Sequence, residues 1–428
     1  MGRWARPCYT AGGLGFLPEP ATMERTESGP FPVYEALQAA TTVNRHLEYD
    51  WKLIEASREE TLKWTPPLAR QMASAVVRMK PAVKWLREPE RLEPLLCQAL
   101  EPVLTGERPR HYWWLVHAAG LFLLEGGATA ADVLGFGSRL RGELAAQVFG
   151  AYPAPRAAEL YGAFDRIWNT GEAIFCWVQI YCQQGGHREQ VRGVSPETMN
   201  RASSQTVTEF AAAATAGPVT APFTSTLQAL IEWTEFGVAD LQVLRESAAT
   251  TRAWPGELAA ELLQYLLHAP LGTGFMESSG LSRADTEERI TQLFQRMAGG
   301  EEEAALFRGM WTIGLLAARA AADPSLLVAA LPPLTQSILR RCMEEPEGER
   351  GASIFLAFQK TLSICTALAV EGFLAGQVRT SQLAGLAPQS LRQAQLAVTQ
   401  ELRSAPFLDG ILSLEAMRRS GFLSLVGR

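Results

Sequence analysis

The segment Tyr112-Trp-Trp-Leu-Val-His-Ala-Ala-Gly-Leu-Phe-Leu-Leu124 is the longest apolar run in this chain. It lies between two breaking sequences, Gly106-Glu-Arg-Pro109 and Gly126-Gly127. A membrane-spanning helix needs about 20 apolar residues, and no run in the sequence reaches 18. The segment is therefore predicted to form a buried helix, with His117 near its middle.

The rest of the chain repeats this design of helical segments separated by Pro and Gly. Ala, Leu, Glu, Arg and Gln are abundant, and apolar residues recur at spacings of three and four. Breaks fall at sequences such as Trp64-Thr-Pro-Pro67, Pro153-Ala-Pro155 and Gly185-Gly186. Alternating runs of Val, Ile and Thr bounded by Asn-Gly or Asp-Gly are absent from the sequence, so hairpins are not expected. The pattern predicts an all-α protein.

Composition narrows the class of protein. The chain has 428 residues, which exceeds one ordinary domain of about 150 residues. It contains 39 Lys and Arg against 45 Asp and Glu, a net charge of -6, which argues against a broad nucleic-acid surface and against a polybasic membrane anchor. The six cysteines include no Cys-x-x-Cys pair, and the first 22 residues lack the apolar core of a signal peptide. These features favour a reduced, cytoplasmic protein.

The two halves of the chain have similar patterns in the same order. Three matches carry the comparison: Lys63-Trp64-Thr-Pro-Pro with Ala253-Trp254-Pro, Val103-Leu-Thr-Gly106-Glu with Met297-Ala-Gly-Gly300-Glu, and Ala163-Phe-Asp-Arg-Ile-Trp with Ala357-Phe-Gln-Lys-Thr-Leu. The second copy has about ten extra residues near 278–288. We interpret this as a tandem duplication of one helical domain; the alternative is two unrelated helical bundles.

This interpretation gives five segments. They are a disordered N-terminal tail (1–29), a first domain (30–187), a Ser-, Thr-, Gly- and Ala-rich linker that can be partly helical (188–225), a second domain (226–378) and a C-terminal helical tail (379–428). Met23 is an alternative start to Met1.

Both halves resemble the globin domain of globin-coupled sensors, bacterial haem sensors related to protoglobins. In the first half the resemblance rests on Asp50-Trp-Lys-Leu, Trp85, Leu104-Thr-Gly106, Tyr112 to His117, and Phe164-Asp165 to Tyr181. In the second half it rests on Asp240-Leu, Phe275, Gly299-Gly300, Gly314 to Ala317, and Phe358 to Phe373. The resemblance implies two tandem globin-like helical domains, with His117 in the position of the proximal haem ligand and Trp85 against the haem face.

Several positions depart from the pattern of that family. Trp114 stands where a glycine precedes the histidine, and Val76-Val-Arg-Met79 stands where the distal tyrosine is expected. The second half has Ala317 in the histidine position, so haem could bind only in the first half. By resemblance, the candidate haem site consists of His117 as metal ligand with Met79, Trp85 and Trp114 around the cofactor. The alternative is a buried core histidine in a domain without haem.

The sequence offers little for catalysis. Asp165, Asn169 and Glu172 share one helical face, a spacing that can hold Mg²⁺, but no second acidic cluster accompanies them, and a solvated polar stripe is expected. The phosphate-binding loop, the His-Glu-x-x-His motif and the Gly-x-Ser-x-Gly motif are missing from the sequence, and Gly135-Phe-Gly137 lacks the third glycine of a dinucleotide site.

We therefore expect a non-enzymatic regulatory or sensory protein that works in signal transduction by binding a protein partner or by self-association. The family resemblance implies a dimer. Neither nucleic acid nor membrane is an expected partner, and no cofactor is expected. The alternative is a haem-binding gas or redox sensor that uses His117.

Overall fold

The structure is a computed structural model. It describes residues 47–79, 89–107, 112–125, 127–191, 194–216, 221–268, 282–300, 303–319, 330–344 and 348–387, with a few single positions beside these ranges. Helix accounts for 91% of the described part and no strand occurs in it, which confirms the all-α prediction. The predicted N-terminal tail, Met23, Trp85 and most of the predicted C-terminal tail lie outside these residues.

The chain alternates helices with short connections. The first half has α2 (Leu47–Glu55), α3 (Arg58–Thr61), the short 3-10 helix η2 (Leu62–Trp64), α4 (Thr65–Arg78), α5 (Pro89–Thr105), α6 (Tyr112–Glu125), α7 (Ala130–Ala151) and α8 (Ala154–Val191). Two helices follow, α9 (Pro196–Ala216) and α10 (Ala221–Thr234). The second half has α11 (Val238–Thr251), α12 (Trp254–His268), α14 (Arg283–Gly299), α15 (Glu303–Arg319), α17 (Leu331–Met343) and α18 (Gly348–Leu383).

Local sequence signals explain where several helices begin and end. Thr129 and Asp132 form a capping box at the start of α7, and Ser282 and Asp285 do the same for α14. Proline occupies the first turn of α4 and of α17, where its missing N–H costs no helical hydrogen bond. Gly300 ends α14 in the left-handed conformation, as a C-terminal glycine commonly does.

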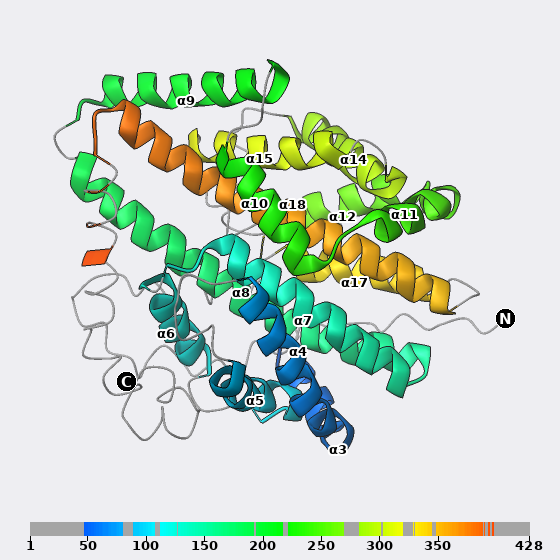
Figure 1. Ribbon diagram of the computed structural model, residues 1–428. Helices are drawn as coiled ribbons and strands as arrows, with labels where there is room; N and C mark the ends of the chain where they lie inside the picture. Colours follow the sequence, from blue (N-terminus) through cyan, green and yellow to red (C-terminus); the bar gives the residue numbers. More distant parts are fainter. Residues whose placement is uncertain are drawn as a thin grey trace.

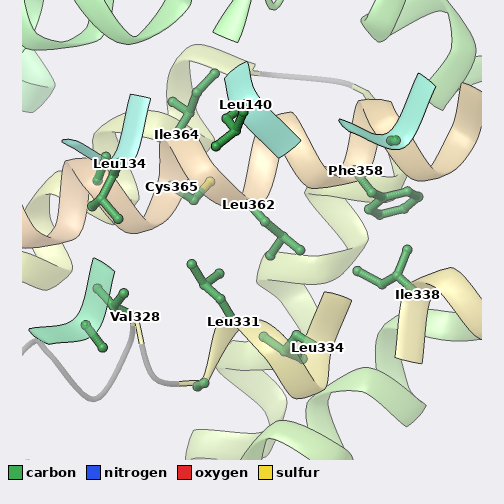
Figure 2. Close-up of a cluster of buried hydrophobic side chains, with 14 of the residues drawn as sticks. Leu134, Leu140, Val328, Leu331, Leu334, Ile338, Phe358, Leu362, Ile364 and Cys365 are labelled. Carbon is green, nitrogen blue, oxygen red and sulfur yellow. The ribbon is translucent and has the colours of Figure 1, made fainter. Parts of the chain in front are cut away.

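Four helices form the centre of the protein. Helix α7 packs on both α8 and α18, and α17 packs on the same two helices. In Figure 1, α4, α5 and α6 lie on one side of this central group, and α11, α12 and α14 lie on the other. Figure 2 shows part of the apolar core, with Leu134 and Leu140 of α7 above Leu362 of α18 in this view and Leu331 and Leu334 of α17 below it. One apolar core therefore runs through both halves.

The segment predicted as a linker is largely helical. Helix α9 lies along α18, to which it is tied by an ion pair of 2.8 Å between Glu209 and Arg379 (Figure 1). Helix α10 packs on α7 and α18 and buries Trp233 against α7. The Ala-rich stretch around Ala211 has high helix propensity, and α9 contacts α18 at earlier residues, where the hydroxyl of Thr206 lies 3.2 Å from the hydroxyl of Thr380. The division into independently folded domains stays a prediction, because the two halves share their core.

Among the described helices, α18 alone is both long and apolar enough to pass a test for a membrane span. Between Arg350 and Leu383 it is long and apolar enough to cross a membrane, with a mean hydropathy of 1.5 over its best 18-residue window. However, 83% of that window is buried inside the protein, as in the core helix of a globular fold. The structure accounts for its apolar character by contacts with α7, α15 and α17.

We predict that Gly106→Ala destabilises the protein by about 1–3 kcal/mol. Gly106 has a φ of 70°, and a Cβ atom there would lie 2.7 Å from the carbonyl oxygen of Trp51. Gly142 in α7 is the matched control, since a Cβ there meets no atom within 4 Å. Gly142→Ala should stabilise the helix by about 0.5–1 kcal/mol. Urea unfolding measures both, and equal effects of the two substitutions would contradict this account of Gly106.

Candidate functional site: a buried charge cluster between the two halves

A group of polar side chains is buried where α7, α8 and α18 meet. Arg141 of α7 donates to Glu172 Oε2 at 2.8 Å and to Asn169 Oδ1 at 3.1 Å, both on α8. Its second terminal nitrogen donates to Ser363 Oγ of α18 at 3.3 Å. Asp165 Oδ1 lies 3.8 Å from Arg141 Nε and accepts a hydrogen bond of 2.8 Å from Asn169. We call these five residues the charge cluster; each is 3% exposed or less.

A glycine makes room for the cluster on α7. Gly137 lies one turn before Arg141, and a Cβ atom at Gly137 would overlap the carboxylate of Glu172 and the indole nitrogen of Trp168. Gly135, two residues earlier, lets the ring of Trp233 approach from α10. The Gly135-Phe-Gly137 sequence therefore serves close packing of helices, consistent with its failure to match a dinucleotide site.

The electrostatics of the cluster follow from its lack of solvent. Burial raises the pKa of Asp165 to about 7, and the neighbouring Arg141 acts in the opposite direction. Burial also raises the pKa of Glu172, although Arg141 and Trp168 both favour its charged form. Two carboxyl groups thus share one guanidinium, and a full negative charge on both leaves the cluster with one uncompensated buried charge.

The expected solvated stripe of Asp165, Asn169 and Glu172 is wrong. The helical spacing is correct, but this face of α8 is turned toward α7 rather than toward water. Arg141 supplies the positive charge that a Mg²⁺ ion would bring. Among the described residues no group of three or more His, Cys, Asp or Glu side chains could hold a metal ion. The carboxyl groups are thus paired with a guanidinium inside the fold, and each residue of the cluster is closed off from solvent.

The candidate haem residues are not gathered at one place among the described side chains. His117 is buried on α6, and burial lowers its pKa to about 4, so that the imidazole is neutral at pH 7. Met79 follows α4 and packs beside a different apolar cluster, which contains Val76, Leu92 and Trp233. The side chain of Trp114 and the whole of Trp85 lie outside the described residues.

His117 could supply an imidazole ligand, but the described residues around it form no haem pocket. Helix α6 packs closely on α8, where Gly120 faces Phe175 and Gly171 faces Val116. Leu121 and Leu124 of α6 form a small apolar cluster with Trp177 of α8. A neutral buried imidazole suits iron ligation. However, side chains of α6 and α8 fill the space between these two helices where the structure describes it, and Met79 packs in a different apolar cluster. The described residues around His117 therefore do not fit a haem group.

Comparison with protein-family models, with curated proteins and with solved structures found no match to this chain. The globin resemblance accordingly stays a prediction that rests on the residues themselves.

Arg141 was not among the sequence-predicted residues, although a signal for it exists. Leu140, Leu144, Ala145 and Val148 form the buried stripe of α7, and Arg141 falls within that stripe at helical spacing. A lone arginine on an apolar face needs an acidic partner, and the unexplained acidic face of α8 could have been paired with it.

We predict that Arg141→Met destabilises the protein by about 3–5 kcal/mol at pH 8, because it strands two buried carboxyl groups. The loss should be smaller at pH 5, where the carboxyl groups can protonate. Arg70→Met is the control. The Arg70 side chain on α4 is 71% exposed and pairs with Glu93, so its loss should cost less than about 1 kcal/mol. Urea unfolding at both pH values tests the pair; similar losses for both arginines would contradict it.

Proposed function

We propose that this chain is a non-enzymatic regulatory protein made of two copies of one helical unit, and that a protein partner acts by shifting the packing of the copies. The globin-like character of the unit is part of this proposal. The observation that carries it is the charge cluster at the contact between the halves, which ties them together and is closed to any substrate. The proposal also predicts a cytoplasmic location.

A constant register between the halves supports the duplication. Residue i of the first half matches residue i+194 of the second from Gly106 and Gly300 to Gln183 and Gln377, without a gap. In this register the buried face of α7 matches the buried face of α17, with Leu140, Leu144 and Val148 opposite Leu334, Ile338 and Cys342. Before Gly106 the offset is 190, which matches Asp50 and Trp64 with Asp240 and Trp254. On this register the second copy has four extra residues before Gly300 (194 − 190), fewer than the ten or so expected.

Equivalent contacts support the same register. Arg166 of α8 binds Asp50 of α2 at 2.6 Å, and Lys360 of α18 binds Asp240 of α11 at 3.0 Å. Both are pairs of matched residues. Gly106 lies against the carbonyl of Trp51, and Gly300 lies against the carbonyl of Leu241, the matched position.

Helix α6, which carries His117, matches helix α15 in the same register. Gly120 packs on Phe175, and the matched Gly314 packs on the backbone of Ala369, the residue that matches Phe175. On this register Trp311, and not Ala317, is the counterpart of His117. The second copy still lacks a histidine at that place.

The two copies pack around an approximate two-fold relation. Helix α7 contacts α18, and the matched helix α17 contacts α8. Tyr161 and Phe355 are matched residues and touch each other edge to face, with ring centroids 5.2 Å apart. A residue that touches its own counterpart lies on a two-fold axis, as in an isologous dimer. The contact between the halves thus resembles a dimer interface within one chain.

We predict that loosening this contact changes what the protein binds. Arg141→Met should alter the set of proteins captured by cross-linking in the source cells, because it disturbs the contact between the copies. Arg70→Met, which removes an exposed ion pair with Glu93 within the first half, should leave that set unchanged. The captured proteins would be compared by mass spectrometry at equal bait levels. Identical sets for wild type and both variants would remove the support for regulation through the contact between copies.

A second candidate, the haem sensor, is favoured by one observation. His117 is buried and its pKa is lowered to about 4, so the imidazole is neutral at pH 7, the form that ligates a metal. The packing of α6 on α8 makes this the weaker candidate.

We expect hemin titration of the whole chain to give no stoichiometric Soret band, because the described neighbours of His117 are filled by helix contacts. The visible spectrum of the wild type and of His117→Ala would be recorded at equal protein concentration. A one-to-one band in the wild type that is lost in His117→Ala would overturn this expectation and establish the sensor.

A further inference from the structure

Helix α7 is held by carboxyl groups at two points. One is the fully buried charge cluster, in the middle of the helix. The other is Glu371 of α18, a partly buried residue whose carboxylate accepts a hydrogen bond of 2.9 Å from the backbone N–H of Ala131 in the first turn of α7. Both contacts reach α7 from a helix packed on it, and the Glu371 contact crosses between the two halves.

Charge is not balanced at either point. In the charge cluster Asp165 and Glu172 share the guanidinium of Arg141. Arg166, beside Asp165 in the sequence, also favours the charged form of Asp165, but it makes its hydrogen bonds to Asp50. Glu371 accepts hydrogen bonds from backbone N–H groups of α7, which favour its charged form, and it faces the like charge of Asp132. Because uncompensated charge away from water is costly, a proton can neutralise one carboxyl group at each point.

We propose that α7 is a proton-dependent connection between the halves: protonation of Asp165 and of Glu371 tightens its packing on α8 and α18, and loss of these protons loosens it. The proposal stands on the buried geometry and does not depend on the partner-binding function.

The other ionisable groups of the surrounding helices are engaged elsewhere. Lys360 and Arg379 of α18 bind Asp240 and Glu209, and Arg340 and Arg341 of α17 bind Glu257 and Glu261 of α12. Arg139 of α7 binds Glu143 and Glu235, while α18 faces Arg141 with the uncharged Ser363. Helix α6 contributes the neutral His117 on its contact with α8. Tyr161 lies one turn before Asp165 and stays protonated, since burial raises its pKa well above 10.

The direction of the pH dependence follows from the raised pKa values of these carboxyl groups. Burial raises the pKa of Asp165 and of Glu371 to about 7, above the ordinary values of free carboxyl groups. A folded state with a raised pKa holds its proton more tightly than the unfolded chain does. The stability that these groups contribute is therefore complete below about pH 4 and is lost as the pH rises through about 7. The α7 contacts should be looser at pH 8 than at pH 5.5.

Substitutions that imitate the protonated groups test the proposal. Asp165→Asn and Glu371→Gln should each raise the urea midpoint of unfolding at pH 8 relative to wild type, and the gain should shrink at pH 5.5. Glu288→Gln, an exposed position on α14, is the control and should give no pH-dependent difference. Hydrogen exchange of α7 peptides, corrected for intrinsic rates, should be faster in wild type at pH 8 than in either variant.

A second measurement covers the case in which a variant fails to fold. The infrared spectrum of the wild-type protein between pH 5.5 and pH 8 should show loss of a protonated carboxyl carbonyl band as the pH rises through about 7, without loss of helix. A wild type without that band, or variants less stable than wild type by the same amount at both pH values, would overturn the proposal.

Discussion

A guanidinium group cannot be buried unless negative charge and hydrogen-bond acceptors surround it, and this requirement at Arg141 constrains the centre of the fold. The acceptors come from α8 and α18, so α7 must lie between these two helices with its polar face turned inward. The absence of a side chain at Gly137 then lets Glu172 reach the same place. The charge cluster thus restricts the rotation and register of α7, and contacts of α7 with α10 and α4 add to its packing.

How much of this could be predicted from the sequence depends on the kind of information required. Pro and Gly breaks and helical spacing were enough for the all-α fold. The acidic face of α8 was also visible, but its environment was predicted wrongly, because periodicity places residues on a face without saying what covers it. Arg141 lies on another helix, so its pairing with Glu172 is a tertiary fact. The linker was predicted from its Ser, Thr, Gly and Ala content, and part of it was allowed to be helical. The contact with α18 that supports helix α9 is a tertiary contact, which composition does not reveal.

The proposed duplication separates what the two copies share from what only one of them has. Ion pairs at Asp50 and Asp240 and close glycines at Gly106 and Gly300 recur in both halves, which is expected for features that maintain a common frame. The charge cluster does not recur. In the proposed register Arg141, Asp165 and Glu172 are opposite Thr335, Gln359 and Thr366, which are also buried but carry no charge. The same frame is therefore stable without the cluster, and the ionisable groups are a property of the first copy alone.

This asymmetry bears on what the cluster does. Replacing a buried ionic group by neutral residues of suitable shape is often neutral or stabilising, so a need for stability does not explain why the first copy holds one. The cluster is also closed to solvent, so a substrate cannot reach it in this structure. The cluster can instead specify one packing of the helices, since buried charges tolerate few alternative packings. It can also respond to pH, since a single proton changes its net charge. Because Arg141 joins α8 to α18, any change in that balance acts on the contact between the two halves and not on one half alone.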